Sequence, residues 1–179
     1  MRVLMALALM LLPANLGFAA EVPKMELFGG YCFVRSAAGD EEAVNMNGWN
    51  LALNARINEH LLLVIEGAGT YGSQGETSAD VSTHTIMAGP QLLASSCEEC
   101  GTIRAFARVL LGVARSRVDV RQTSSSDGGF AFAVGGGVDL RVIGNIMIRP
   151  VQLDYERVYT FEEPADNVRY SAGIVLPLM

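Results

Sequence analysis

The stretch NMNGWNLALNARI, residues 45–57, alternates between two kinds of side chain along its whole length. Its odd positions are mostly large and apolar, as at Trp49 and Leu51, whereas its even positions are small or polar, as at Gly48 and Asn50. Successive side chains of a β-strand point to opposite faces, so this period of two predicts a strand with one apolar face. The small residues on the other face suit the interior of an eight-stranded barrel, which side chains must just fill.

Seven further segments show similar alternation and are separated by turn signals, so we expect eight strands in all. The expected strands are Lys24–Ser36, Asn45–Ile57, Leu61–Gly72, Val81–Ser95, Thr102–Val118, Phe130–Ile143, Asn145–Tyr159 and Asn167–Leu178. The pattern predicts an all-β fold, namely an eight-stranded antiparallel up-and-down transmembrane β-barrel.

Short and long connections alternate between the expected strands. The short connections are residues 58–60, 95–101 and 144–145. The long connections are residues 37–44, 73–80, 119–129 and 160–166. Outer-membrane barrels have short periplasmic turns and longer outer loops, so we expect the long connections to lie outside the cell.

Composition points the same way. Half of the residues are hydrophobic, yet the longest uncharged stretch beyond the N-terminus, Val81–Cys97, is interrupted by Gly89-Pro90 and dotted with polar side chains. High apolar content without an apolar helix is typical of a membrane barrel, in which only alternate residues face lipid. The formal net charge of −6 and the lack of a basic stripe exclude nucleic acid as a partner.

The N-terminus has the composition of an export signal. A positive charge at Arg2 precedes the apolar run Val3–Leu12, and small residues follow. We expect residues 1–19 to be a cleaved signal peptide and residues 20–179 to form the barrel; cleavage after Ala20 is the alternative. A membrane anchor is disfavoured because a helical span needs about 20 apolar residues.

Short motifs follow one another across the whole mature chain. They are ELFGGY at 26–31, NGWN at 47–50, GP at 89–90, FARVLLGVA at 106–114, GGGVD at 135–139, IRPVQLDY at 148–155 and RYSAG at 169–173. In order and spacing, these motifs resemble those of small OmpA-like outer-membrane β-barrel domain proteins. The resemblance implies a bacterial outer-membrane location, insertion by the barrel-assembly machinery and contact with outer-membrane lipid.

Parity within the expected strands places balanced charges on the inward face. These predicted interior residues are Glu26, Arg56, Glu66, Arg104, Arg108, Asp139, Arg141, Asp154, Glu156 and Arg169. A buried charge without a partner is costly, so the balance predicts a plugged barrel that does not conduct. Arg149 has the opposite parity to Gln152. Either a β-bulge at Pro150 turns Arg149 inward, or Arg149 lies at the periplasmic rim.

Four arginines are expected to face outward at the outer ends of their strands: Arg35, Arg115, Arg117 and Arg157. Arginine in mid-membrane costs about 2–4 kcal/mol and much less at the interface. The guanidinium fork matches phosphate groups, so these residues are candidate contacts for lipopolysaccharide. The alternative is that they are solvated charges at the bases of loops. Aromatic residues expected at the same rim are Phe33, Trp49, Tyr71, Phe130, Phe132, Tyr155 and Tyr170.

Cysteine chemistry is predicted at one turn. Cys97 and Cys100 form a C-x-x-C in an expected periplasmic turn, where export permits a disulfide. A redox or metal function is the alternative, but it would need a thioredoxin-like setting or further ligands. Cys32 is expected to be a small inward-facing filler.

The leading functional hypothesis is a monomeric, non-enzymatic barrel with a structural or interaction role at the cell surface. We expect no catalytic residue, no cofactor and no metal site. A small pore is the main alternative. A lipid A-modifying enzyme that uses Ser82 and His84, or a soluble ligand-binding barrel, is a further alternative. A soluble carrier would need its apolar side chains inside, opposite to the pattern found.

Overall fold

The computed structural model describes residues 25–37, 44–74, 79–95, 103–120, 123–159 and 164–178. The expected signal peptide lies outside these residues, as does the Cys97–Cys100 pair. The eight strands are β1 (Met25–Ala37), β2 (Val44–Arg56), β3 (Leu61–Gln74), β4 (Ala79–Ser95), β5 (Ile103–Val120), β6 (Thr123–Ile143), β7 (Ile146–Tyr159) and β8 (Pro164–Leu178). Within the described residues, no helix is long and apolar enough to cross a membrane.

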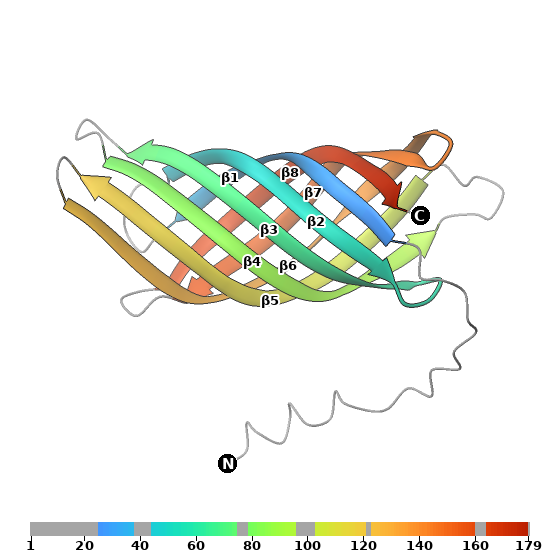
Figure 1. The fold of residues 1–179 in the computed structure, drawn as a ribbon, viewed down its shortest axis with the longest axis horizontal. Coiled ribbons are helices and arrows are strands. Elements are labelled where there is room, and N and C mark those ends of the chain that lie inside the picture. Colours follow the sequence, from blue (N-terminus) through green and yellow to red (C-terminus); the bar gives the residue numbers. More distant parts are fainter. Residues whose placement is uncertain are drawn as a thin grey trace, which may run out of the picture.

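Each strand pairs antiparallel with its neighbours in sequence, and β1 pairs with β8 to close the barrel (Figure 1). The last residues of β2, β4 and β6 lie at one end of the barrel, which we call the turn end. The last residues of β1, β3, β5 and β7 lie at the opposite end, which we call the loop end. The predicted fold class is confirmed.

The largest difference from the expected strands is at β6, which begins at Thr123 rather than at Phe130. The Ser- and Gly-rich residues 124–129 indicate a loop by composition. They are extended because their ladder with β5 continues as far as the pair Val120 and Thr123. The long connection expected at 119–129 is therefore wrong, since only residues 121–122 separate the two strands.

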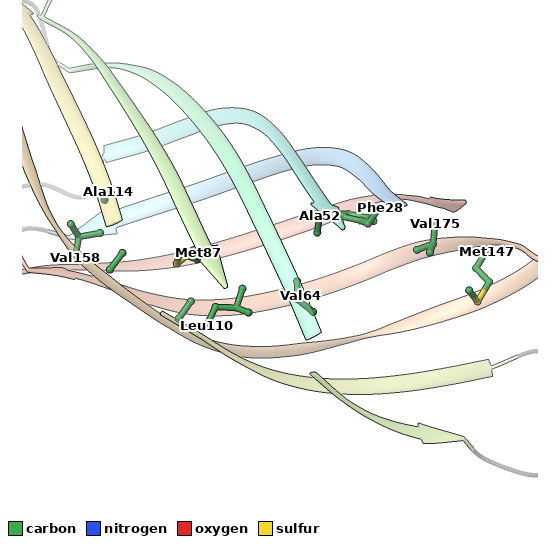
Figure 2. Close-up of a cluster of buried hydrophobic side chains, with 11 residues drawn as sticks. Phe28, Ala52, Val64, Met87, Leu110, Ala114, Met147, Val158 and Val175 are labelled. Atoms are coloured by element: carbon green, nitrogen blue, oxygen red, sulfur yellow. The ribbon is translucent and has the colours of Figure 1, made fainter. Parts of the chain in front are cut away.

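Burial alternates along the strands and places large apolar side chains on the outer face. Ile86 is 65% exposed and Val113 is 61% exposed, although both are strongly hydrophobic. Such a face requires lipid around it. The interior holds a smaller apolar set. Figure 2 shows its members distributed along the barrel, from Ala114 and Val158 toward the loop end to Met147 and Val175 toward the turn end.

A β-bulge in β7 changes which side chains enter the interior. The register between β7 and β8 shifts between Arg149 and Gln152, so both side chains are buried while Pro150 between them is exposed. Proline lacks an N–H and is tolerated at bulges. The hydroxyl of Tyr170 donates to the carbonyl oxygen of Pro150 at 2.7 Å. The structure therefore contains the β-bulge, which was the first of the two alternatives for Arg149, and the Arg149 side chain lies inside the barrel.

The glycine run on β6 makes room for side chains from other strands. A Cβ at Gly135 would overlap the carboxylate of Asp154, and a Cβ at Gly137 would lie 2.8 Å from the ring of Phe106. These glycines therefore serve close packing in the barrel interior.

Candidate functional site

Five buried charged side chains occupy the middle of the lumen, and we call them the central cluster. They are Glu66, Arg108, Asp154, Glu156 and Arg169. Nη1 of Arg108 lies 2.6 Å from Oε2 of Glu66, and Nη2 donates to Oδ2 of Asp154 at 2.8 Å. Arg169 pairs with Glu66 and lies 3.4 Å from both Asp154 and Glu156. Three carboxylates thus face two guanidinium groups, which gives the central cluster a net charge of −1.

A second set of five lies nearer the β2–β3 and β6–β7 connections, and we call it the turn-end cluster. Its members are Glu26, Arg56, Arg104, Asp139 and Arg149. Arg104 donates to Glu26 at 2.8 Å and to Asp139 at 2.7 Å. Arg149 donates through Nε to Oδ1 of Asp139 at 2.7 Å. Two carboxylates face three guanidinium groups, so the turn-end cluster has a net charge of +1.

Two aromatic rings pack against the extra cation of the turn-end cluster. The guanidinium carbon of Arg149 lies 4.4 Å from the ring centre of Phe28 and 4.1 Å from that of Phe106. The face of an aromatic ring attracts a cation, and this attraction strengthens when water is excluded. Both rings are buried with Arg149, so this part of the lumen is filled.

Gln152 joins the two clusters. Its side-chain oxygen accepts from Nη1 of Arg149 at 2.7 Å, and its Nε2 donates to Oδ2 of Asp154 at 2.8 Å. The bulge makes this link possible because it turns Arg149 and Gln152 inward together. Sequence parity places Gln152 on the same face as Asp154 and Glu156, but it does not predict the hydrogen bond to Arg149; the signal for that contact is the break in alternation at Pro150.

Arg141 corrects the predicted set of interior charges. It is exposed near the end of β6, whereas Arg149 is 1% exposed and takes a place inside. The ladder between β6 and β7 shifts register around Arg141, where the sheet approaches the Gly144 turn and leaves the packed lumen. The other predicted interior charges line the lumen, with Arg56 the most exposed of them.

The four predicted rim arginines lie on the outer face toward the loop end. Arg35, Arg115 and Arg117 are exposed, and Arg157 is half-buried. Nε of Arg157 lies 3.4 Å from Oδ1 of Asp166 on β8. The structure does not gather the four into one cluster, because they stand on β1, β5 and β7 with other strands between them.

A row of aromatic and polar side chains crosses the outer face at the level of the rim arginine Arg115. Cross-strand pairing aligns Trp49 with Gly69, Gly69 with His84, and His84 with Arg115. The ring of His84 packs edge-on against Tyr71, with the ring centres 5.7 Å apart. Among the described residues, no hydrogen bond joins His84 to Ser82 or to a carboxylate, so the parts of a catalytic triad are not assembled here.

A cavity of about 80 Å³ lies on the loop-end side of the central cluster. Its hydroxyl-bearing lining comes from β1, β3, β4 and β5, and its charged lining from β7 and β8. Glu156 and Arg169 of the central cluster form part of its wall. The packing of the lumen is thus looser here than around Arg149.

Of the three cysteines, the structure describes Cys32. Cys32 is fully buried on β1, inside the barrel. The Cys97–Cys100 disulfide remains a prediction, since neither residue is among those described.

Comparisons with known proteins agree on the type of barrel. A family model described as outer membrane protein beta-barrel domain matches residues 4–175. No curated protein matches the chain. Neisserial surface protein A superposes with a TM-score of 0.75 at 13% identity, covering 87% of this chain and 99% of that one.

Two further solved structures are similar in fold. Ail, the attachment invasion locus protein of Yersinia pestis, has a TM-score of 0.61 at 17% identity and covers 87% of this chain and 100% of its own. Ail has also been solved in complex with the heparin analogue sucrose octasulfate. OprG of Pseudomonas aeruginosa has a TM-score of 0.58 at 10% identity, covering 88% of this chain and 97% of its own.

Proposed function

The chain belongs to the outer membrane protein beta-barrel domain family, and from this premise we propose that it is a non-conducting structural barrel whose loop end contacts lipopolysaccharide. As a family member it is a bacterial outer-membrane barrel. The single observation that carries the non-conducting role is the hydrogen-bonded chain of charges that runs along the lumen.

The charged chain supports a closed lumen for an energetic reason. Each guanidinium in it reaches at least one carboxylate within 4 Å, and Gln152 connects the two clusters without a gap. Removing a buried charge from its partner costs about 3–5 kcal/mol. An ion path through the lumen would have to break several such pairs together, so a steady open state is unfavourable.

Planar-bilayer recording tests the closed lumen. We expect no steady ion conductance through the purified, folded barrel. The variant with both Arg108→Ser and Asp154→Ser should conduct, because it removes a pair from the centre of the lumen without changing the net charge. The matched control, Arg157→Ser with Asp166→Ser, removes a pair on the outer face and should stay silent. Steady conductance of the unmodified protein would favour the small-pore alternative.

Contact with lipopolysaccharide is the second part of the proposal. The supporting observation is that Arg35, Arg115 and Arg117 are exposed on the outer face, level with aromatic side chains. Aromatic rings favour the membrane–water interface, and guanidinium groups match phosphate geometry. The complex of Ail with sucrose octasulfate illustrates an anionic sugar on a barrel of the same fold.

Retention of lipopolysaccharide during purification tests this contact. Replacing Arg35, Arg115, Arg117 and Arg157 by Gln should lower the amount that co-purifies with the folded barrel. Arg141→Gln is the matched control, because Arg141 is exposed at the opposite end. Unchanged retention in the quadruple variant would leave these residues as solvated loop-base charges.

We further propose a monomer that is inserted by the barrel-assembly machinery after removal of residues 1–19. A closed sheet has no free edge that could pair with a second copy. N-terminal sequencing of the mature protein and sedimentation in detergent check the cleavage site and the monomer. Thiol labelling without reductant checks the Cys97–Cys100 disulfide. The proposal includes no enzymatic activity and no cofactor.

A further inference from the structure

We propose that the cavity beside the central cluster binds one small monovalent cation, at Glu156. This proposal does not depend on the lipopolysaccharide contact or on the conductance of the barrel. It starts from the charge of the central cluster, where three buried carboxylates face two guanidinium groups. The compensating cation, Arg149 of the turn-end cluster, is held by Asp139, Phe28 and Phe106. Buried charges that lack a nearby partner are costly, so the formal charge of −1 on the central cluster favours a counter-charge bound beside it.

Glu156 is the carboxylate of the central cluster with the weakest protein partner. Glu66 and Asp154 each lie within 2.8 Å of Arg108, whereas Glu156 is reached by Arg169 at 3.4 Å. Arg169 divides its guanidinium among all three carboxylates. Glu156 also lines the cavity, so its carboxylate is the one placed to take a ligand there.

Apart from Glu156 and Arg169, the cavity is lined by hydroxyl and amide side chains and by apolar ones; the apolar residues are Val34, Met46, Ala68, Val158 and Ala165. Thr70, Thr83, Thr85 and Ser116 stand on β3–β5, opposite Glu156 and Asn167 on β7 and β8. Oγ1 of Thr85 and Oδ1 of Asn167 are buried, and within the described residues neither has a hydrogen-bond partner. Buried polar atoms are normally satisfied, so these two point to a ligand that oxygen atoms can bind.

The ligand class follows from this donor set and from size. One carboxylate with hydroxyl and amide oxygens suits a hard cation that oxygen binds, and a single positive charge balances the central cluster. A cavity of about 80 Å³ is several times the roughly 10–15 Å³ that one water needs, but far below the roughly 300–1,000 Å³ of a drug-sized site. A sodium, potassium or small alkylammonium ion fits these limits.

Equilibrium unfolding of the refolded full-length barrel in detergent tests the site. Sodium, potassium or methylammonium chloride replaces tetraethylammonium chloride at constant ionic strength, so that screening is unchanged and the reference cation is too large for the cavity. A ligand that binds the folded state alone raises stability by mass action. We expect the urea midpoint to rise and then saturate with at least one of the small cations. The cation that acts at the lowest concentration distinguishes an inorganic from an organic ligand.

Variants locate the effect. Glu156→Gln should abolish the cation-dependent rise, and Thr85→Val should shift it to several-fold higher cation concentration. Glu59→Gln, at an exposed turn carboxylate, should keep the full rise. Sodium NMR line broadening with folded Thr85→Val gives a second readout if Glu156→Gln does not fold. Equal midpoints in all four salts, or a full rise in Glu156→Gln or Thr85→Val, would overturn the proposal.

Discussion

The turn-end cluster and the central cluster each contain five charged side chains, but they differ in sign and in their surroundings. The turn-end cluster has one guanidinium in excess, and Arg149 packs between the rings of Phe28 and Phe106. The central cluster has one carboxylate in excess, and Glu156 borders a cavity with hydroxyl groups on its far wall. An extra buried cation can thus be accommodated by aromatic faces, whereas an extra buried anion here is left beside open space.

Removing one carboxylate from each cluster should produce the largest contrast. Asp139→Asn raises the turn-end charge to +2 and leaves Arg104 and Arg149 without their shared partner, so we expect a loss of about 3–5 kcal/mol in unfolding free energy. Glu156→Gln makes the central cluster neutral and should change stability by less than about 1 kcal/mol. Urea unfolding in tetraethylammonium chloride, followed by the fluorescence of the single tryptophan, Trp49, measures both. Equal losses would show that cluster charge does not decide stability.

Adding volume to each region is the next test. Gly137→Ala places a methyl group against the ring of Phe106 and a neighbouring backbone carbonyl, and should cost about 1–3 kcal/mol by overpacking. Ala68→Val adds more volume but points into the cavity, so its cost should stay below about 1 kcal/mol. Unfolding curves for the two variants in the same detergent check this order. A larger loss for Ala68→Val would contradict the difference in packing.

A smaller effect on stability is expected at the β-bulge that brings Arg149 into the turn-end cluster. Tyr170→Phe removes the hydrogen bond to the carbonyl of Pro150 and should cost about 0.5–1.5 kcal/mol. Tyr155→Phe is a matched control, because the hydroxyl of Tyr155 donates to Asp166 on the exposed face at the same distance. Thermal unfolding of both variants should show the lower midpoint for Tyr170→Phe. Identical midpoints would mean that the bulge does not depend on this hydrogen bond.

The smallest effect is expected at Arg56. Its side chain is 31% exposed and reaches Glu26 at 3.2 Å, so Arg56→Gln should cost less than about 1 kcal/mol. The change also makes the turn-end cluster neutral, which offsets part of the lost pairing. Unfolding at two salt concentrations measures this change in unfolding free energy. A loss as large as that of Asp139→Asn would show that the excess cation is required for stability.

Alternation in the sequence predicted the strands and most interior side chains because the period of a strand is fixed by backbone geometry. It failed at two arginines. Arg149 was left undecided because the shift in the β7–β8 ladder changes which residue meets the lumen. Arg141 pairs with the buried Met147, but it lies near the end of β6, where the side chains are exposed. A bulge depends on both strands, so one strand's sequence indicates it only as a break, as at Pro150.

The start of β6 and the cavity could not be predicted either, because each depends on more than one segment of the chain. Composition indicates a loop at 124–129, but pairing with β5 decides that these residues are extended. The cavity depends on the combined volumes of side chains from opposite walls, such as Thr85 and Glu156, which are far apart in sequence. Sequence parity gives the direction of a side chain and says nothing of the space left across the lumen.

The ladder between β1 and β8 also constrains the order of events during folding. Met25 pairs with Leu178, so the sheet closes only when the first and last strands are both available. Bringing distant residues together has an entropic cost that grows with chain separation, and folds rich in such contacts form slowly. Until the last strand arrives, β1 and β7 remain as unpaired edges. The newly exported chain therefore needs protection from aggregation over its whole length before it can insert.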